Sequence, residues 1–362
     1  MLILGLETSC DETAAAVLDT NGEANGEADD RKARVRSDIV SSQADFFAAY
    51  GGVVPELASR NHAARILPVV RRALAEAKAT YADLDAVAAT YGPGLTGALL
   101  VGLNFGKALA WGLGVPFVGV NHLAAHLQAP LLAEGAPRPP FVGLLVSGGH
   151  TALYAVDEAA ERPGLLEFEL LGETVDDAVG EAYDKVGRLL GVDYPAGPTL
   201  DRWAGEYSEG YGGDSAGPAE GFTRPMPAGL DFSFAGLKTA AARRIAELAA
   251  AGGLDDARKR SLAAGFQTAA VETLGEKALA ACARTGLTSL IVGGGVAANS
   301  GLRAYLGRRA AEEGVRAFFA PLRLCTDNAV MIAARGRRLI ESGLRHDLDL
   351  EAVACLELGV EE

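Results

Sequence analysis

The stretch Gly5-Leu-Glu-Thr-Ser-Cys-Asp-Glu-Thr-Ala14 sets the pattern that predicts the fold. An apolar strand over Leu2–Glu7 runs into this polar turn, and a second apolar strand returns over Ala14–Leu18. The same pattern recurs in Leu144-Leu-Val-Ser-Gly-Gly-His-Thr-Ala152, where an apolar strand, a Gly turn and Thr-Ala follow one another. We interpret the two hairpins as one in each lobe of a duplicated architecture. Chance similarity between two strand–turn–strand units is the alternative.

The composition indicates an α/β protein with many tight turns. Of 362 residues, 49% are hydrophobic, 6% are aromatic and 45 are Gly, and this length suits one large or two medium domains. No apolar run of about 18 residues occurs and the N-terminus lacks a basic region, so we expect neither a membrane span nor a signal peptide. The four Cys are scattered without paired spacing, which favours a reduced, cytoplasmic location.

The net charge of −14 bears on nucleic-acid binding. A chain that holds nucleic acid alone usually shows a basic excess or a basic stripe. This chain has no such excess. If it acts on a nucleic acid, it needs a local basic surface or a basic partner.

Helical and strand patterns alternate along the rest of the chain. Helices are expected over Val53–Glu76, Ala98–Trp111, Thr174–Leu190, Leu262–Ala283 and Asn328–Ser342, and strands over Leu84–Ala89, Val115–Val120, Phe141–Val146 and Ser289–Val292. The polar stretch Asn21–Lys32 predicts a long hairpin loop or insertion, and the Gly-, Ser- and Pro-rich residues 204–230 predict another loop.

Three Gly-rich turns each follow an apolar strand: Gly92–Gly97, Ser147–Gly149 and Gly293–Gly295. Without Cβ atoms, backbone N–H groups can approach an anion closely, and a following helix adds its dipole. None fits the P-loop or the dinucleotide GxGxxG pattern. One such turn is more often a plain turn. Three of them, with the first hairpin, favour a site for a nucleotide or an acyl phosphate.

His122 and His126 are four residues apart, so both imidazoles lie on one face of a helix and can reach one metal ion. The zinc-protease signature has Glu directly after the first His, where this chain has Leu123. Asp327 is the leading third ligand, with Cys325 behind it; two His and a carboxylate suit iron(II) or zinc. Buried, hydrogen-bonded rings and a helix-capping Asp327 are the alternatives. Weaker candidates are His62, His150 and His346.

An acidic face is expected on the helix over 174–190, because Asp177, Glu181 and Asp184 share one side and Asp176 adjoins them. A solvated charged surface explains most of these groups. Asp184 is the exception, since a Gly-bearing turn and Asp201 follow closely. Carboxylates near such a turn suit ribose hydroxyls, which need acceptors.

Seven blocks of the sequence, in order and over nearly its whole length, carry a family resemblance. They are Leu4–Thr13, Tyr50–Arg60, Gly92–Leu95, Leu145–Thr151, Asp231–Thr239, Gly293–Asn299 and Cys325–Asn328. The chain resembles the bacterial tRNA N6-adenosine threonylcarbamoyltransferases, the TsaD family, formerly described as O-sialoglycoprotein endopeptidases. The resemblance implies the two-lobed actin/Hsp70/sugar-kinase (ASKHA) fold, which is α/β with duplicated mixed-sheet lobes. The N-terminal lobe is expected over 1–119 plus 328–362. The C-terminal lobe, with an inserted helical segment, is expected over 120–327.

The implied activity is transfer of the threonylcarbamoyl group from threonylcarbamoyl-AMP to N6 of adenosine 37 in tRNAs that read ANN codons, which forms t6A. By resemblance, one divalent ion per subunit, with Fe(2+) favoured over Zn(2+), takes His122, His126 and Asp327. Asp11 is the candidate catalytic residue, and Glu12 lies beside it in the first hairpin. The adenylate positions are Leu145, Val146, Ser147, Gly148, Gly149, Asp184, Gly197, Asp201 and Asn299.

Two departures from the family pattern stand out. Many relatives have Glu-Gly between the metal histidines, where this chain has Ala124-Ala125, so contacts around the ligands differ. The loop Asn21–Lys32 is longer than usual, which alters a surface available to partners.

The partners implied by the resemblance are tRNA, a noncatalytic TsaB-like paralogue and a TsaE-like ATPase, with no membrane. Local phosphate contacts are candidates, with solvated surface as the alternative, at Lys32, Arg34, Arg36, Arg188, Arg224, Lys238, Arg243 and Arg244. The rival functions are a metalloprotease, a small-molecule kinase of the same fold class and a nucleotide-gated scaffold.

Overall fold

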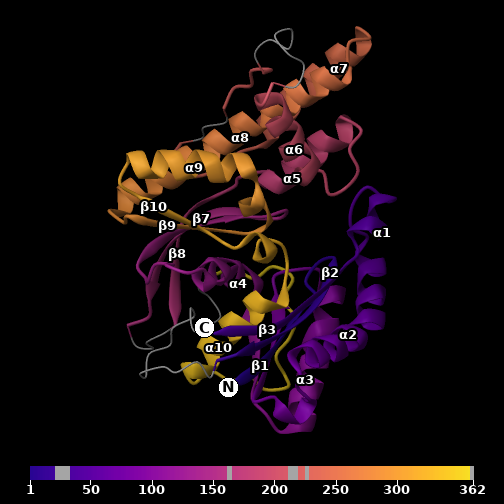
Figure 1. The fold of residues 1–362 in the computed structure, drawn as a ribbon, viewed down its shortest axis with the longest axis vertical. Helices are drawn as coiled ribbons and strands as arrows, with labels where there is room; N and C mark the ends of the chain where they lie inside the picture. The colour runs from indigo at the N-terminus through magenta and orange to yellow at the C-terminus, as the bar shows by residue number, and fades with distance from the viewer. Residues whose placement is uncertain (21–32, 161–164, 211–218, 225–227, 359–362) are drawn as a thin grey trace. The chain divides into compact units, whose positions relative to one another are not determined.

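The computed structural model describes residues 1–20, 33–160, 165–210, 219–224 and 228–358 (Figure 1). The chain separates into two compact units, Met1–Pro139 with Val156–Phe168 and Ala320–Glu362, and Pro140–Ala155 with Glu169–Phe319. These limits put residues 120–139, 156–168 and 320–327 in the first unit, whereas the expected lobe boundaries assign them to the second. The predicted loop over 21–32 lies outside the described residues.

The first sheet has the strand order β3-β2-β1-β4-β5. Its strands are β1 (Leu2–Glu7), β2 (Glu12–Asp19), β3 (Arg34–Ser42), β4 (Ala86–Gly92) and β5 (Phe117–Asn121). The central strand β1 pairs antiparallel with β2 and parallel with β4, and it is buried at every position. The predicted first hairpin is therefore present at the centre of this sheet.

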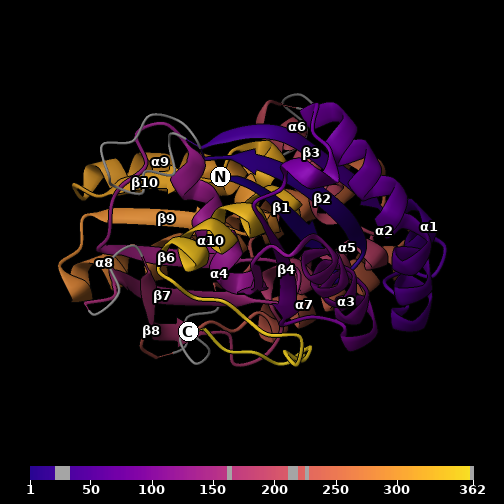
Figure 2. The same ribbon diagram turned by 90° about the horizontal axis from the view of Figure 1, so that it is seen from below.

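Helices cover both faces of the first sheet. They are α1 (Ala44–Ala48), α2 (Pro55–Ala77), α3 (Thr96–Leu113), α4 (His122–Gln128) and α10 (Ala329–Glu341), with short 3-10 turns at Tyr81–Asp83, Ala129–Leu132 and Leu322–Leu324. Because side chains alternate along β1, Leu4 and Leu6 join the core cluster under α2 and α3, while Gly5 faces α10. Figure 2 shows α10 alongside β1 and α4.

Two glycines set how closely α10 lies on the sheet. A Cβ at Gly5 would lie 2.3 Å from the Ala329 carbonyl oxygen. A Cβ at Gly336 would lie 2.4 Å from the Ala88 Cβ. This close approach fixes the start of α10, and with it the segment that carries Asp327.

The second sheet has the order β10-β9-β6-β7-β8. Read from its other edge, as β8-β7-β6-β9-β10, it repeats the order of the first sheet strand for strand. Its strands are β6 (Phe141–Val146), β7 (Thr151–Glu158), β8 (Leu166–Glu173), β9 (Ser289–Gly293) and β10 (Arg316–Phe319). Its helices are α5 (Val179–Leu189), α6 (Gly197–Ser208), α7 (Ala235–Ala250), α8 (Asp256–Thr285) and α9 (Ser300–Glu312), with a 3-10 turn at Gly295–Ala298. The equal strand orders support the duplication inferred from the two hairpins.

Two predicted elements have different limits in the structure. The helix expected over 174–190 begins only at Val179, so Asp176 and Asp177 precede it and do not share a helical face with Asp184. The loop expected over 204–230 begins later, because α6 continues to Ser208. Among the described residues, no helix is long and apolar enough to cross a membrane.

Candidate functional site

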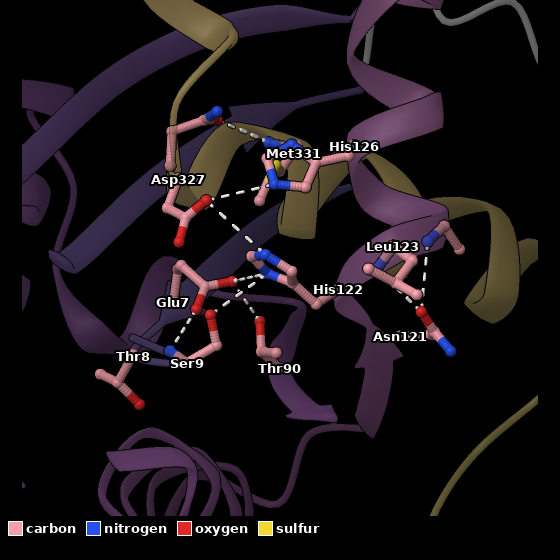
Figure 3. Close-up of polar contacts among 12 residues, drawn as sticks. Glu7, Thr8, Ser9, Thr90, Asn121, His122, Leu123, His126, Asp327 and Met331 are labelled. Atoms are coloured by element: carbon pink, nitrogen blue, oxygen red, sulfur yellow. Dashed lines mark hydrogen bonds and ion pairs between the residues drawn. The ribbon is translucent and has the colours of Figure 1, made fainter. Parts of the chain in front are cut away.

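The two histidines project from the first turns of α4 because Asn121 caps this helix. The Asn121 Oδ1 accepts hydrogen bonds from the backbone N–H groups of Leu123 at 2.8 Å and Ala124 at 3.2 Å. The helix therefore begins at His122, one turn before His126, and the two ring centroids lie 4.6 Å apart (Figure 3). The predicted helical pair is present.

Asp327 meets both histidines. Its Oδ1 lies 3.1 Å from the Nε2 of His126 and 3.6 Å from the Nε2 of His122 (Figure 3). One donor atom from each of these three residues lies within 4.8 Å of the others. The residue that caps α10 is Asn328, which accepts the Met331 N–H, so the capping alternative for Asp327 is wrong.

Cys325 does not join this group. Its thiol, which is buried, donates to the carbonyl oxygens of Ala320 and Pro321 at 3.5 Å. Those backbone contacts give the thiol a structural explanation, and the donor set consists of two imidazoles and one carboxylate.

The fully buried Glu7 orients His122, and sequence reasoning missed it. The Oε2 of Glu7 lies 3.0 Å from His122 Nδ1 and accepts a hydrogen bond from the Thr90 hydroxyl at 2.6 Å, while the Ser9 N–H donates to Oε1 (Figure 3). A carboxylate that accepts from Nδ1–H leaves Nε2 directed at Asp327. The available signal was a lone carboxylate at the end of an otherwise apolar strand.

The electrostatics of the cluster favour a cation. Burial opposes the charging of His122, but Asp327 and Glu7 outweigh it and raise the pKa of His122 to about 9. Burial and the neighbouring His122 lower the pKa of His126. Burial acts to raise the pKa of Glu7, yet its contacts with His122 leave that pKa below the ordinary value. The two carboxylates together require one positive charge beside them.

The donor set fits a divalent metal. The raised pKa of His122 means that, without an ion, Nδ1–H faces Glu7 and a second proton on Nε2 faces Asp327 Oδ1. A divalent ion would replace that second proton, because the Nε2 lone pair and Asp327 Oδ1 would then both face one cation. Imidazole nitrogens with one carboxylate are ligands that iron(II) and zinc accept.

The first hairpin holds the candidate catalytic residue. Asp11 is buried, and its carbonyl accepts the Gln43 N–H at 3.0 Å. The adjacent Glu12 accepts the Ser42 hydroxyl at 3.0 Å. Burial, with Asp327 and Asp11 adding to it, raises the pKa of Glu12 to about 10. Neither carboxylate belongs to the metal-ligating group, and the role of Asp11 stays a prediction.

Two of the histidines that were weaker candidates for metal ligands make structural contacts. His62 is buried, with its Nδ1 2.8 Å from the Thr13 hydroxyl and its Nε2 3.0 Å from the Cys10 carbonyl oxygen. The Nδ1 of His346 accepts the Gly119 N–H at 3.0 Å. Both rings tie turns and strand ends to their neighbours.

In the second unit, the Gly turn after β6 is tight and exposed. The Ser147 N–H donates to the His150 carbonyl at 2.8 Å, and the His150 N–H donates to the Ser147 hydroxyl at 3.1 Å. A Cβ at Gly148 or Gly149 would meet nothing within 4 Å, so the backbone there is open to a ligand. By contrast, the side chains of Leu145 and Val146 are wholly buried.

Two further glycines pack against this turn. A Cβ at Gly180 would lie 2.6 Å from the Ser147 carbonyl oxygen, and one at Gly294 would lie 2.3 Å from that of Val146. Gly294 also has φ +98°, which disfavours other residues. The second and third Gly-rich turns therefore meet at the end of β6. The Gly92–Gly97 turn belongs to the first unit, where the Leu95 N–H donates to the Ser9 carbonyl of the first hairpin at 2.8 Å.

The polar candidates of the second unit make hydrogen bonds at the starts of helices. Asp184 accepts the Ala196 N–H at 2.8 Å, just before Gly197 opens α6. Asp201 accepts the backbone N–H and the hydroxyl of Ser300 at 3.0 and 2.8 Å. Ser300 is the first residue of α9, and Asn299 caps that helix. The structure therefore brings Asp201 and Asn299 together at the start of α9.

The acidic residues before α5 have a structural role. Asp176 accepts the Ser233 hydroxyl and the N–H groups of Phe234 and Ala235, which caps the start of α7. Asp177 forms ion pairs with Lys185 and Lys238. These contacts replace the predicted solvated face for both residues.

Several candidate phosphate contacts are paired with carboxylates. The pairs are Arg36 with Asp19, Arg224 with Glu272, Lys238 with Asp177, Arg243 with Glu247 and Arg244 with Glu220. Lys32 lies outside the described residues. These ion pairs therefore neutralise much of the positive charge that was expected to contact phosphates.

Solved structures share the fold of this chain at low sequence identity. The HypF of T. kodakarensis is 15% identical, with a TM-score of 0.57 over 94% of this chain and 48% of that one. A full-length HypF described as phosphate- and nucleotide-bound is 12% identical, with a TM-score of 0.56 over 94% of this chain and 46% of that one. These likenesses, with the two mixed sheets, confirm the α/β, ASKHA-type fold class.

Sequence relatives extend over nearly the whole chain. A protein of Nitrosospira multiformis is 47% identical over 347 residues, 95% of this chain and 92% of the relative, and is named tRNA N6-adenosine threonylcarbamoyltransferase. One of Symbiobacterium thermophilum with the same name is 47% identical over 359 residues, 99% of this chain and 97% of the relative. The family model of the same description matches residues 34–334. The chain therefore belongs to the TsaD family, the tRNA N6-adenosine threonylcarbamoyltransferases.

Proposed function

We propose that this chain transfers the threonylcarbamoyl group from threonylcarbamoyl-AMP to N6 of adenosine 37 in tRNAs that read ANN codons. The observation that carries the proposal is identity of 47% with named transferases over nearly the full length of both chains. As a member of this family, the chain is an acyltransferase that acts on tRNA. The threonylcarbamoyl donor and the position of the modified adenosine are the finer parts of the proposal.

His122, His126 and Asp327 are proposed to hold one divalent ion, with Fe(2+) favoured over Zn(2+). When bound, such an ion would supply a Lewis acid for orienting the threonyl carboxylate or hydroxyl and for polarising the carbamoyl carbonyl. Glu7 supports this assignment because it holds the ring of His122 with Nε2 toward Asp327. The same contact fixes which ring nitrogen is available as a ligand.

The adenylate is proposed to bind at the end of β6. Support comes from the open backbone at Gly148 and Gly149, whose N–H groups suit a phosphate and the negative charge that develops during acyl transfer. The ligand positions proposed with them are Leu145, Val146, Ser147, Asp184, Gly197, Asp201 and Asn299.

The reaction is acyl transfer from a mixed anhydride. The N6 amine attacks the carbamoyl carbon, the new N–C bond forms, the C–O bond to the phosphate breaks, and AMP leaves with the electron pair. The amine loses one proton, and Asp11, buried at the first hairpin, is the candidate to accept it. Positioning of the two substrates supplies much of the acceleration.

We propose that tRNA is held jointly with a TsaB-like paralogue and a TsaE-like ATPase. The net charge of −14 and the carboxylate-paired cations support the need for a partner surface. The cytoplasmic location stays a prediction from the scattered cysteines.

The test is mass spectrometry of tRNA nucleosides from a host that lacks its own enzyme of this family. Expression of this chain is expected to restore t6A, and an Asp327→Ala variant is expected not to. Peptide cleavage or phosphate transfer to a metabolite without t6A would overturn the proposal in favour of the protease or the kinase. The residue after His122 is Leu123, which already disfavours the protease because no Glu base stands there.

A further inference from the structure

We propose that Gln267, in the middle of α8, is a positioning residue that sets the hydrogen-bonding directions of Asp201 and Asn299. The inference rests on the proposed function, because it assigns these two residues to the nucleotide. Gln267 is 6% exposed, and neither the sequence motifs nor the family resemblance singled it out. Its side-chain amide bridges Asp201 and Asn299, the two candidate nucleotide-binding residues.

Gln267 makes three hydrogen bonds within the second unit. Its Nε2 donates to Asp201 Oδ1 at 2.9 Å. Its Oε1 accepts from Asn299 Nδ2 at 2.8 Å and from the Tyr183 hydroxyl at 3.3 Å. One buried amide thus joins two residues that lie almost a hundred positions apart in the chain.

The direction of each bond is fixed by its neighbours. Asn299 Oδ1 accepts the Leu302 N–H at 2.9 Å, so Nδ2 must be the group that faces Gln267. The Asp201 carboxylate can only accept. A flipped Gln267 amide would place donor against donor and acceptor against acceptor. A Cβ at Gly301 would lie 2.8 Å from the amide nitrogen, which shows how tightly the backbone encloses it.

These bonds decide which atoms remain for a ligand. Asp201 Oδ1 already accepts from Gln267 and from the Ser300 hydroxyl, whereas Oδ2 accepts only the Ser300 N–H. Among the described residues, one acceptor position therefore remains on Oδ2, while the second amide hydrogen of Asn299 is directed at the Tyr183 hydroxyl. A free carboxylate acceptor suits a ribose hydroxyl, which donates to it. Gln267 holds the Asp201 carboxylate and the Asn299 amide in this orientation.

The test compares Gln267→Glu with Tyr183→Phe in the purified full-length chain. Glu retains the acceptor for Asn299 but sets a carboxylate against Asp201, whereas Phe removes only the Tyr183 hydroxyl from the network. Calorimetry measures the affinity for AMP, 2′-deoxy-AMP and 3′-deoxy-AMP. We expect Gln267→Glu to weaken AMP binding roughly tenfold and to reduce the preference for AMP over the deoxy analogues. Tyr183→Phe is expected to change affinity by less than about threefold.

A structural role alone would lower the melting temperature without changing the preference among the three nucleotides. Wild-type affinity and wild-type preference in Gln267→Glu would overturn the role of Gln267 and leave the proposed function intact. If Gln267→Glu does not fold, Gln267→Met fills similar space without charge and is expected to show the same loss of preference. If the wild-type chain binds none of the nucleotides, the proposed function loses its nucleotide site and the role of Gln267 falls with it.

Discussion

The side chain of Glu7 orients the ring of His122. Replacing Glu7 with Gln keeps the shape but removes the charge that holds Nδ1–H of His122. We expect metal affinity to fall by about 10- to 100-fold, the usual effect of losing such a contact behind a ligand. Competition with a chelator, read by metal analysis, measures this. Thr90→Val, which removes one hydrogen bond to Glu7 but leaves the carboxylate, is the control and is expected to lose less. Equal affinities for wild type and Glu7→Gln would contradict the orienting role.

His62 is a buried residue whose titration predicts acid sensitivity. Burial lowers the pKa of His62, with the hydrogen bond to Cys10 only partly opposing it. The folded state therefore binds fewer protons than the unfolded state between the lowered pKa and 6.5, so stability falls as the pH drops through that window. Urea unfolding between pH 7.5 and 5 measures the slope, and His62→Gln is expected to flatten it. An unchanged slope in that variant would refute the assignment.

Residue-level prediction from the sequence succeeded where spacing alone places side chains. His122 and His126 share a face because the helix repeat dictates it. The sequence could not give Glu7 its role, because the contact joins strands and a helix far apart in the chain. Nor could it show that Asp176 faces the start of α7, since this depends on how two segments pack.

At the scale of elements, the start of α7 depends on a cap from a distant segment. Asp176→Ala removes the acceptor for the N–H groups of Phe234 and Ala235. We expect the free energy of unfolding to fall by about 1 kcal/mol, as for other lost helix caps. Glu181→Ala, which removes an exposed pair with Lys185, is the matched control and is expected to cost less than about 0.5 kcal/mol. Chemical denaturation measures both, and equal effects would contradict the capping role.

The packing of α10 on the sheet gives a second prediction at this scale. Gly336→Ala places a methyl group against the Ala88 side chain, so it is expected to destabilise the protein by about 1–3 kcal/mol. Gly112→Ala in α3 meets nothing within 4 Å and is expected to stabilise by about 0.5–1 kcal/mol. Thermal unfolding distinguishes the two. A neutral Gly336→Ala would show that α10 can move away from β4.

The limits of helices and strands were predictable where apolar residues recur without interruption, as in β1 and α2. The predicted start of α5 was wrong, although the acidic residues before Val179 fit a helical pattern. The carboxylate of Asp176 binds Ser233 and that of Asp177 binds Lys238, and neither residue joins the helix. Side-chain contacts of this kind compete with helix formation and are not visible in local sequence.

At the scale of the whole molecule, charge predicts dependence on a partner. We expect the purified chain alone to bind tRNA only weakly at physiological salt, because its net charge is −14 and several basic side chains are already paired. Filter binding with and without the proposed TsaB-like and TsaE-like partners measures this. Tight binding by the chain alone, with a steep salt dependence, would show that an unidentified basic surface suffices.

The equal strand orders of the two sheets have a consequence for the donor set. Strand β5 in the first sheet corresponds to β10 in the second. The histidines follow β5 directly, and Asp327 follows β10 a short distance along the chain. The ligands thus lie on the two chain segments that follow these corresponding strands. All three ligands lie in the first unit; the segment after β5 carries the two nitrogens and the segment after β10 carries the oxygen, so neither segment alone completes the set of three.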